Sequence, residues 1–214
     1  PLAFSDKEPQ GMLIEGFDEK VVIATNYNFQ WLPERLSMLG FEKEKDLVSY
    51  LMPVPDKNPR MLEVVCSRLN SQSSWKVMHF STKKQLKPWV VPIFRLINTA
   101  YRHIYGFKPL TEAEMHDYAK RYMPVLDPHF VKIITSENGE VIAFVVAIPE
   151  ISDGIKKAKG RLLPFGWWYI LKASSQSTLL TMLLGAVDER FRGIGLAALL
   201  AAAIFQEARS RNML

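Results

Sequence analysis

Residues 187–200 read VDERFRGIGLAALL. An apolar run ends at Val187, the chain turns through Arg192-Gly193-Ile194-Gly195, and an Ala/Leu-rich segment of helical character follows. A strand, a glycine turn and a helix in this order direct free backbone N–H groups and the positive end of a helix dipole at one point, which is how proteins hold phosphate. The pattern therefore predicts an anion site where the helix begins. The alternative is a strand-to-helix turn that binds nothing.

The composition is typical of a globular protein with a buried core. The chain has 214 residues, 48% of them hydrophobic, which is enough for one large domain or two small ones. The most apolar stretch, 162–187, is interrupted by Pro164, Gly166 and Lys172, so we do not expect it to span a bilayer. Cys66 is the single cysteine, which excludes disulfides within the chain and favours a cytoplasmic location. Because the sequence opens on proline and closes within a predicted helix, we expect a fragment of a longer protein.

Charge is distributed unevenly behind a net charge of +5. Residues 64–111 contain no Asp or Glu, although eight cations lie there: Arg68, Lys76, Lys83, Lys84, Lys87, Arg95, Arg102 and Lys108. A solvated basic face and a site for nucleic acid or another polyanion are both compatible with this composition. Apolar residues recur beneath these charges at helical spacing, which predicts that they point into a core: Val90, Ile93, Phe94, Ile97, Ala100, Tyr101 and Ile104.

Local signals place the remaining elements. Thr111 with Glu114 forms a capping box at a helix start, and Asn138-Gly139 is a strong hairpin signal between two strands. We expect strands at 21–25, 46–52, 75–80, 130–135, 141–148 and 178–187. We expect helices ending near Leu39, at 60–69, between Pro88 and Gly106, after Thr111, at 151–163 and at 196–211.

From Trp75 onward, this order of elements resembles the front half of the GNAT N-acetyltransferase superfamily. The acyl-CoA loop of that family carries Arg/Gln-x-x-Gly-x-Gly/Ala, and residues 192–197 read RGIGLA. The family usually places an apolar residue five positions before the arginine, where this chain has Val187. The resemblance implies an α/β (α+β) fold with a mixed, mostly antiparallel sheet flanked by helices.

A second stretch resembles the back end of the same superfamily. Residues 28–50 read NFQWLPERLSMLGFEKEKDLVSY, with a helix that ends in Leu-Gly-Phe before a final strand. The resemblance implies two GNAT-like units in tandem, as in a group of double-GNAT bacterial proteins. The expected divisions are the end of a first unit at 1–55, a linker helix at 56–74 and the start of a second unit at 75–214. Completion of one permuted sheet by the two parts is the alternative.

The resemblance also implies a co-substrate, acetyl-CoA or another acyl-CoA, and a small-molecule or peptide amine as acceptor. The pantetheine arm would pair with the backbone of residues 185–187, and the pyrophosphate would meet the N–H groups of the glycine turn. Arg192 either pairs with a phosphate or faces solvent as a turn arginine. The implied co-substrate residues are Ala186, Val187, Arg192, Gly193, Ile194, Gly195, Leu196 and Ala197.

The catalytic base is not assigned. Many members of the superfamily carry a Glu on the strand before the loop, and residues 178–187 contain no carboxylate. Asp188 and Glu189 follow the strand as turn acids, and Glu150 is a weak candidate for the base. No metal-ligand spacing relates the four histidines to one another or to Cys66. The cluster at 167–169 lines a substrate pocket or belongs to the core.

Three functions are compatible with these observations. Acyl transfer from acyl-CoA to an amine is the first, and binding of acyl-CoA without turnover is the second. The third is a degenerate, non-catalytic module that binds nucleic acid or another polyanion through the basic region.

Overall fold

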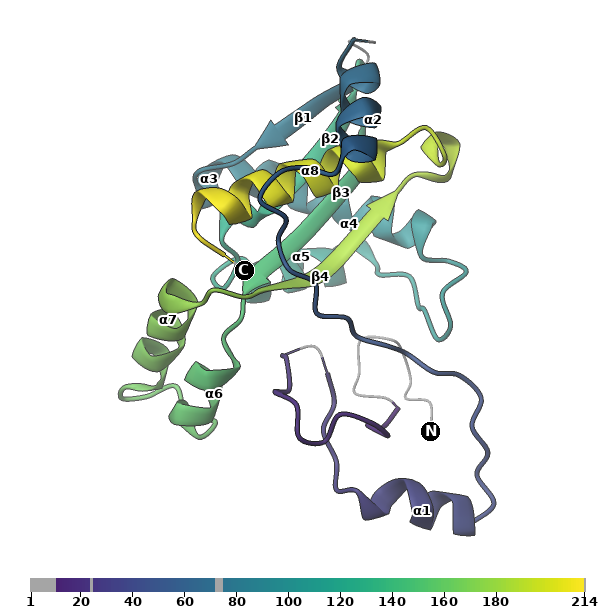
Figure 1. Ribbon diagram of the computed structural model, residues 1–214, viewed down its shortest axis with the longest axis vertical. Coiled ribbons are helices and arrows are strands. Elements are labelled where there is room, and N and C mark those ends of the chain that lie inside the picture. The colour runs from purple at the N-terminus through teal and green to yellow at the C-terminus, as the bar shows by residue number, and fades with distance from the viewer. Residues whose placement is uncertain (1–10, 24, 72–74, 214) are drawn as a thin grey trace. The chain divides into compact units, whose positions relative to one another are not determined.

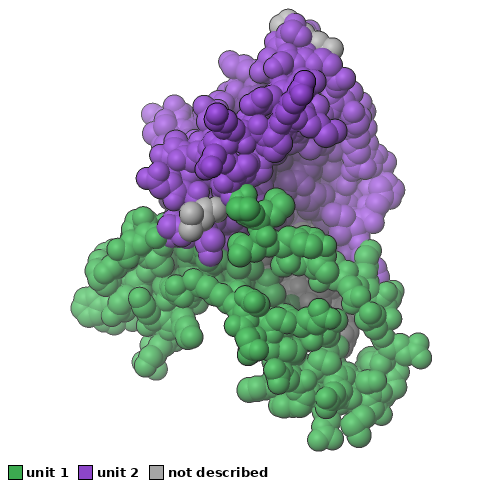
Figure 2. All heavy atoms as spheres, in the orientation of Figure 1, with its two compact units in different colours: residues 1–53, 150–176 green, residues 54–149, 177–214 purple. Residues whose placement is uncertain are grey.

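The computed structural model describes residues 11–23, 25–71 and 75–213. The chain divides into two compact units, 1–53 with 150–176 and 54–149 with 177–214 (Figure 2). The second unit holds a four-stranded sheet in the order β1-β2-β3-β4 (Figure 1). Every pairing is antiparallel and helices flank the sheet, which confirms the predicted α/β class. The strands are β1 (Trp75–His79), β2 (Val131–Ser136), β3 (Val141–Pro149) and β4 (Leu180–Val187).

The centre of the sheet is β3, whose nine residues are all buried. Strands β2 and β3 form the hairpin that Asn138-Gly139 predicts, with Gly139 at a φ of 77° and Ser136 N donating to Glu140 O. Because successive side chains of a strand alternate between the two faces, β3 supplies a core on each side of the sheet. On one face Phe144 and Val146 meet a helix, and on the other Ala143 and Val145 meet a different pair of helices.

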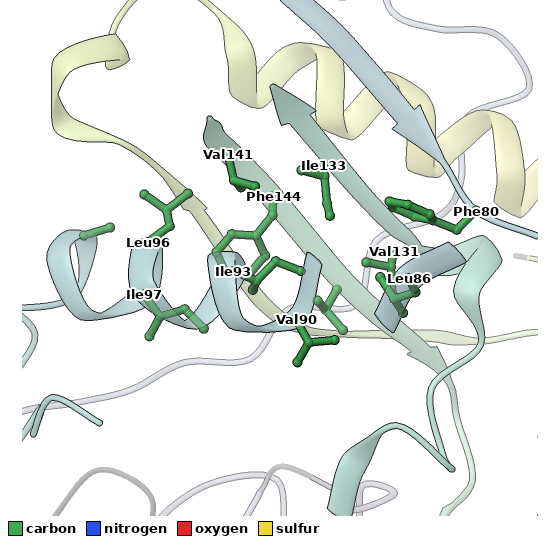
Figure 3. Close-up of a cluster of buried hydrophobic side chains, with 12 residues drawn as sticks. Phe80, Leu86, Val90, Ile93, Leu96, Ile97, Val131, Ile133, Val141 and Phe144 are labelled. Carbon is green, nitrogen blue, oxygen red and sulfur yellow. The ribbon is translucent and has the colours of Figure 1, made fainter. Parts of the chain in front are cut away.

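The first face is covered mainly by α4 (Val90–Ala100). Its residues Val90, Ile93 and Ile97 pack on Phe144 of β3 and on β2, as Figure 3 shows. The preceding α3 (Lys83–Leu86) and η1 (Lys87–Trp89) close one end of this core. Helix α5 (Glu112–Tyr122) packs outside α4 and begins with the predicted capping box between Thr111 and Glu114.

The second face is covered by α2 (Arg60–Ser71) and α8 (Leu196–Ser210). Helix α8 crosses the sheet in Figure 1 and buries Leu196, Leu199, Leu200 and Ile204 against it. It ends at Ser210, which confirms the helix predicted at 196–211. Residues 211–213 are not helical, so the expectation that the sequence closes within this helix is wrong for the residues described there. The 3₁₀ turn η2 (Pro128–Phe130) precedes β2.

A buried ion pair fastens α8 to β2. Lys132 is 1% exposed, and its Nζ donates to Glu207 Oε2 of α8 at 3.0 Å. Burial acts to raise the pKa of Glu207, but the hydrogen bond and charge of Lys132, together with Arg211, outweigh it and lower that pKa. Removal of Glu207 would leave the buried Lys132 ammonium without its carboxylate partner, so the pair helps to fix where α8 lies on the sheet.

The first unit contains α1 (Trp31–Met38) and a helical hairpin of α6 (Ser152–Ala158) and α7 (Gly166–Gln176). The helix predicted to end near Leu39 is present as α1, and Gly40 follows it at a φ of 86°. The strand predicted at 46–52 is wrong, because those residues form no regular structure. The strand predicted at 21–25 is wrong for the residues described there, and Ala24 lies outside the described residues. The tandem origin and its divisions stay predictions.

Candidate functional site

The cavity of the second unit lies where β4 passes into α8. It has a volume of about 630 Å³. Three segments line it: the end of β4 (Gly185, Ala186 and Val187), the turn and start of α8 (Phe191, Arg192, Gly193, Gly195, Leu196 and Ala197), and the residues at and after the end of α4 (Ala100, Tyr101, His103 and Ile104). All the co-substrate residues that the sequence predicts line this cavity except Ile194.

Ile194 has a structural role instead. Its side chain packs on the core under α8, and its carbonyl oxygen accepts a hydrogen bond of 3.0 Å from Arg68 Nη2 of α2. Ile194, between the two glycines, therefore fixes the position of the turn relative to the core of the second unit.

The two glycines of the turn lie in the left-handed region, with φ values of 79° at Gly193 and 110° at Gly195. A Cβ on Gly193 would meet nothing within 4 Å, so this position is open. A Cβ on Gly195 would lie 2.6 Å from Val65 Cγ1 and 3.2 Å from Leu69 Cδ1 of α2. The lack of a side chain at Gly195 thus lets α2 pack closely against the turn, as well as allowing the backbone its positive φ. The contact joins two segments that are far apart in the sequence.

The backbone donors at the start of α8 are available to a ligand. Within the described part of the chain, the N–H groups of residues 193–197 have no hydrogen-bond partner. The first turn of any helix leaves such groups unsatisfied, and here four of the five residues line the cavity. Their dipoles and the helix dipole favour an anion at this place.

Cationic side chains stand at the same end of the cavity. Arg192 Nη2 donates to Ala100 O at 3.3 Å, so this guanidinium joins the turn to the end of α4 instead of facing solvent only. Glu189, in η3 (Glu189–Phe191), forms ion pairs with Arg102 at 2.6 Å and with Arg192 at 3.9 Å. Two arginines share one carboxylate, which leaves the rim with an excess of positive charge.

The acids after β4 are structural, as the sequence indicates. Asp188 caps η3 by accepting from Arg190 N at 2.9 Å. The hydrogen bond from the Arg190 side chain lowers the pKa of Asp188, against the effect of burial. Arg190 also bridges to Glu140 at 2.7 Å. Glu150 lies in the first unit, where it is buried and its Oε1 accepts from Ser152 N at 2.7 Å. Its catalytic role stays a prediction.

The outer edge of β4 holds the feature that sequence analysis missed. The Tyr101 hydroxyl donates to Gly185 O at 3.0 Å and accepts from Gly185 N at 3.2 Å. One hydroxyl therefore takes the place that the amide of an added strand would occupy. Helix α4 ends at Ala100. Tyr101 packs against the core as predicted, whereas Ile104 is 51% exposed, so its predicted place in the core is wrong. The sequence predicts that the helix ends at Gly106, but the chain leaves the helix earlier, after Ala100.

The basic region at 64–111 is partly neutralised within the unit. Arg95 pairs with Glu112, Arg102 pairs with Glu189, Arg68 donates to Ile194 O, and Lys83 donates to Pro124 O. At least half of its eight cations are thus engaged, which weakens the case for a polyanion site there. Among the residues that the structure describes, no group of His, Cys, Asp and Glu side chains is placed to hold a metal ion. No described helix has the length and apolar character needed to cross a bilayer.

Comparison with known proteins gives distant relatives. No family model matches the chain. It is 28% identical over 171 residues to a bacterial ceramide synthase of Caulobacter vibrioides, a match that covers 80% of this chain and 44% of that protein. It is 29% identical over 200 residues to Protein YghO of Escherichia coli, covering 91% of this chain and 50% of that protein. The chain therefore spans about half the length of these relatives.

Among solved structures, the chain is similar to Ard1 from Thermoplasma volcanium. The TM-score is 0.36 at 20% identity, over 66% of this chain and 68% of that one. This similarity is too distant to bear on the site.

The two glycines of the turn are expected to differ in their tolerance of a side chain. Gly193→Ala should cost about 1–2 kcal/mol of unfolding free energy, because an alanine is held at positive φ in open space. Gly195→Ala should cost a further ~1–3 kcal/mol, because its Cβ also meets α2. Urea unfolding of the two variants measures the difference. Equal losses would contradict the packing of Gly195 on α2.

Proposed function

We propose that the cavity binds the CoA portion of an acyl-CoA and that the protein transfers the acyl group to an amine. The observation that carries the proposal is that one cavity is lined by the first turn of α8, whose N–H groups have no partner among the described residues, and by the outer edge of β4 at Gly185. The pyrophosphate of CoA is a dianion, and the start of α8 offers it backbone donors, a helix dipole and Arg192.

The pantetheine arm contains amides that pair with a strand as another strand does. At the outer edge of β4, Gly185 lines the cavity, and its N–H and C=O are both hydrogen-bonded to the Tyr101 hydroxyl. A pantetheine amide would displace that hydroxyl from the same N–H and C=O groups, so the hydroxyl competes with the ligand for this edge. One extended ligand would then contact both the glycine turn before α8 and the outer edge of β4.

The transfer step needs a nucleophilic amine and a group that accepts its proton. Attack of the amine nitrogen on the thioester carbonyl forms the C–N bond, the C–S bond breaks, and CoA leaves as the thiol. The residues that line the cavity include no carboxylate, so the proton acceptor is another group, such as the His103 imidazole in the cavity lining, or water. The function of the loop in this proposal is to hold CoA, and catalysis requires further groups.

The acceptor class in this proposal comes from the relative named as a ceramide synthase. A ceramide is the N-acyl derivative of a long-chain amino alcohol, so its synthesis forms an amide bond at an amine. This agrees with the amine acceptor that the sequence resemblance implies, and it favours a long-chain amine over a peptide.

Ala197 provides the direct test of the CoA site. It is exposed in the first turn of α8 and lines the cavity. Ala197→Glu should weaken acetyl-CoA binding by about tenfold or more, because a carboxylate there repels the phosphates. The same carboxylate favours the helix, so the fold is retained. Isothermal titration calorimetry measures the affinity.

Ala197→Gln is the matched control, since it has nearly the same size without the charge. It should bind acetyl-CoA more tightly than Ala197→Glu. Equal affinities for the two variants, or no binding by the unaltered chain, would contradict the proposal. Release of the CoA thiol when a long-chain amine is added reports transfer in the same samples.

Tyr101→Phe tests the strand edge separately. Loss of the hydroxyl frees the N–H and C=O of Gly185, so acetyl-CoA should bind about three- to tenfold more tightly than to the unaltered chain. The same calorimetric titration measures the change. Binding that is unaltered or weaker would show that the ligand does not use this edge.

A further inference from the structure

The hairpin of α6 and α7 is closely packed on its inner side. A Cβ on Gly154 of α6 would lie 2.6 Å from Tyr169 O and 2.7 Å from Ile170 Cα of α7. A Cβ on Gly166 would lie 1.7 Å from Arg161 O. Glycines at these two positions let the backbones touch, so the hairpin is a defined element and its outer side chains are held in place.

The outer side of the hairpin is apolar and exposed. The sequence analysis left the aromatic residues at 167–169 either in a pocket or in the core. Trp167 and Trp168 are 49% and 47% exposed, so they do not belong to the core, and they do not line the cavity of the second unit. With them, six large apolar side chains of the hairpin face away from its interior: Leu162, Leu163, Phe165, Trp167, Trp168 and Leu171. We call this set the apolar surface of the hairpin. Apolar residues gathered in this way mark a surface that meets an apolar phase or partner.

The charges of the hairpin are mostly positive. No Asp or Glu occurs from residue 154 to residue 187. Five cations belong to the hairpin: Lys156, Lys157, Lys159, Arg161 and Lys172, all exposed. The nearest acid before them, Asp153, pairs with Lys20 at 2.8 Å.

The aromatic residues combine with these cations as they do at a membrane interface. Lys172 Nζ lies 5.0 Å from the centre of the Trp168 ring, and Trp167 Nε1 donates to Pro164 O. Indole rings prefer the headgroup level of a bilayer, and long cationic side chains reach from an apolar surface to anionic headgroups. Helix α7 has 11 residues, too few to span a bilayer and enough to lie on one.

We propose that the α6–α7 hairpin binds the surface of an anionic phospholipid bilayer, with the apolar surface inserted among the headgroups and Lys156, Lys157, Lys159 and Arg161 against lipid phosphates. Charge selects this partner: the hairpin carries five cations and one acid, Asp153, which is paired with Lys20, so it repels a second copy of itself and is complementary to anionic lipid. The inference goes beyond acyl transfer and does not depend on it, because it concerns the first unit and no CoA enters its test.

The test is sedimentation of the 214-residue chain with vesicles. The chain should sediment with vesicles of phosphatidylcholine mixed with phosphatidylglycerol, and much less with phosphatidylcholine alone. Lys156→Glu combined with Lys157→Glu should weaken this binding by about tenfold or more, because four units of charge change at the bilayer surface. Trp167→Ser combined with Trp168→Ser should also weaken it and should abolish the blue shift of tryptophan emission that vesicles cause.

The matched control is Lys84→Glu combined with Lys87→Glu. These lysines are exposed, lie in the second unit and give the same change of net charge. The control should bind vesicles as the unaltered chain does. Equal loss in the control and the hairpin variant would overturn the proposal, since binding would then follow net charge alone.

Two further results would overturn it. One is failure of the unaltered chain to sediment with the mixed vesicles. The other is a dimer in vesicle-free buffer that the tryptophan variant abolishes, which would assign the apolar surface to contacts between copies of the chain. Circular dichroism of each variant establishes that it is folded.

Discussion

The backbone at Gly193 and Gly195 is the constraint on which the candidate site depends. The chain must leave an edge strand and enter a helix within a few residues, and both glycines take positive φ to do so. Gly195 also lies against Val65 and Leu69 of α2, where any Cβ would clash. Ile194, packed into the core between them, and Arg68, bound to its carbonyl oxygen, hold the turn in place. The turn is therefore built into the body of the second unit.

This constraint brings together groups of different kinds. The first turn of α8, the outer edge of β4 and the residues at and after the end of α4 line the same cavity. The Lys132–Glu207 pair helps to fix α8 on the sheet and so the direction of its dipole. The hydrogen bond from Arg192 to Ala100 O links the turn to the end of α4 and places a positive charge at the edge of the cavity. A ligand with a pyrophosphate at one end and amides along its length matches this order of donors and acceptors.

Sequence predicted the parts that local chemistry determines. The Asn138-Gly139 hairpin, the Thr111 capping box and the glycine turn before α8 each depend on residues a few positions apart, and each is present. Contacts between distant segments were not predictable in this way. Nothing near Tyr101 in sequence indicates that its hydroxyl reaches Gly185, and nothing near Lys132 indicates a partner on α8. Residues 46–52 have the composition of a strand, yet they pair with no other strand and form none. Ile194 matched the loop pattern but packs inward, because a pattern fixes the backbone and not the direction of each side chain.

The most direct test of the account is an amide ¹H–¹⁵N spectrum of the labelled chain, titrated with acetyl-CoA. The account predicts that the largest shifts occur at the N–H groups of Gly193, Gly195, Leu196 and Ala197, and at Gly185 on the edge of β4. Shifts confined to other parts of the chain, with these amides unmoved at saturating ligand, would contradict it.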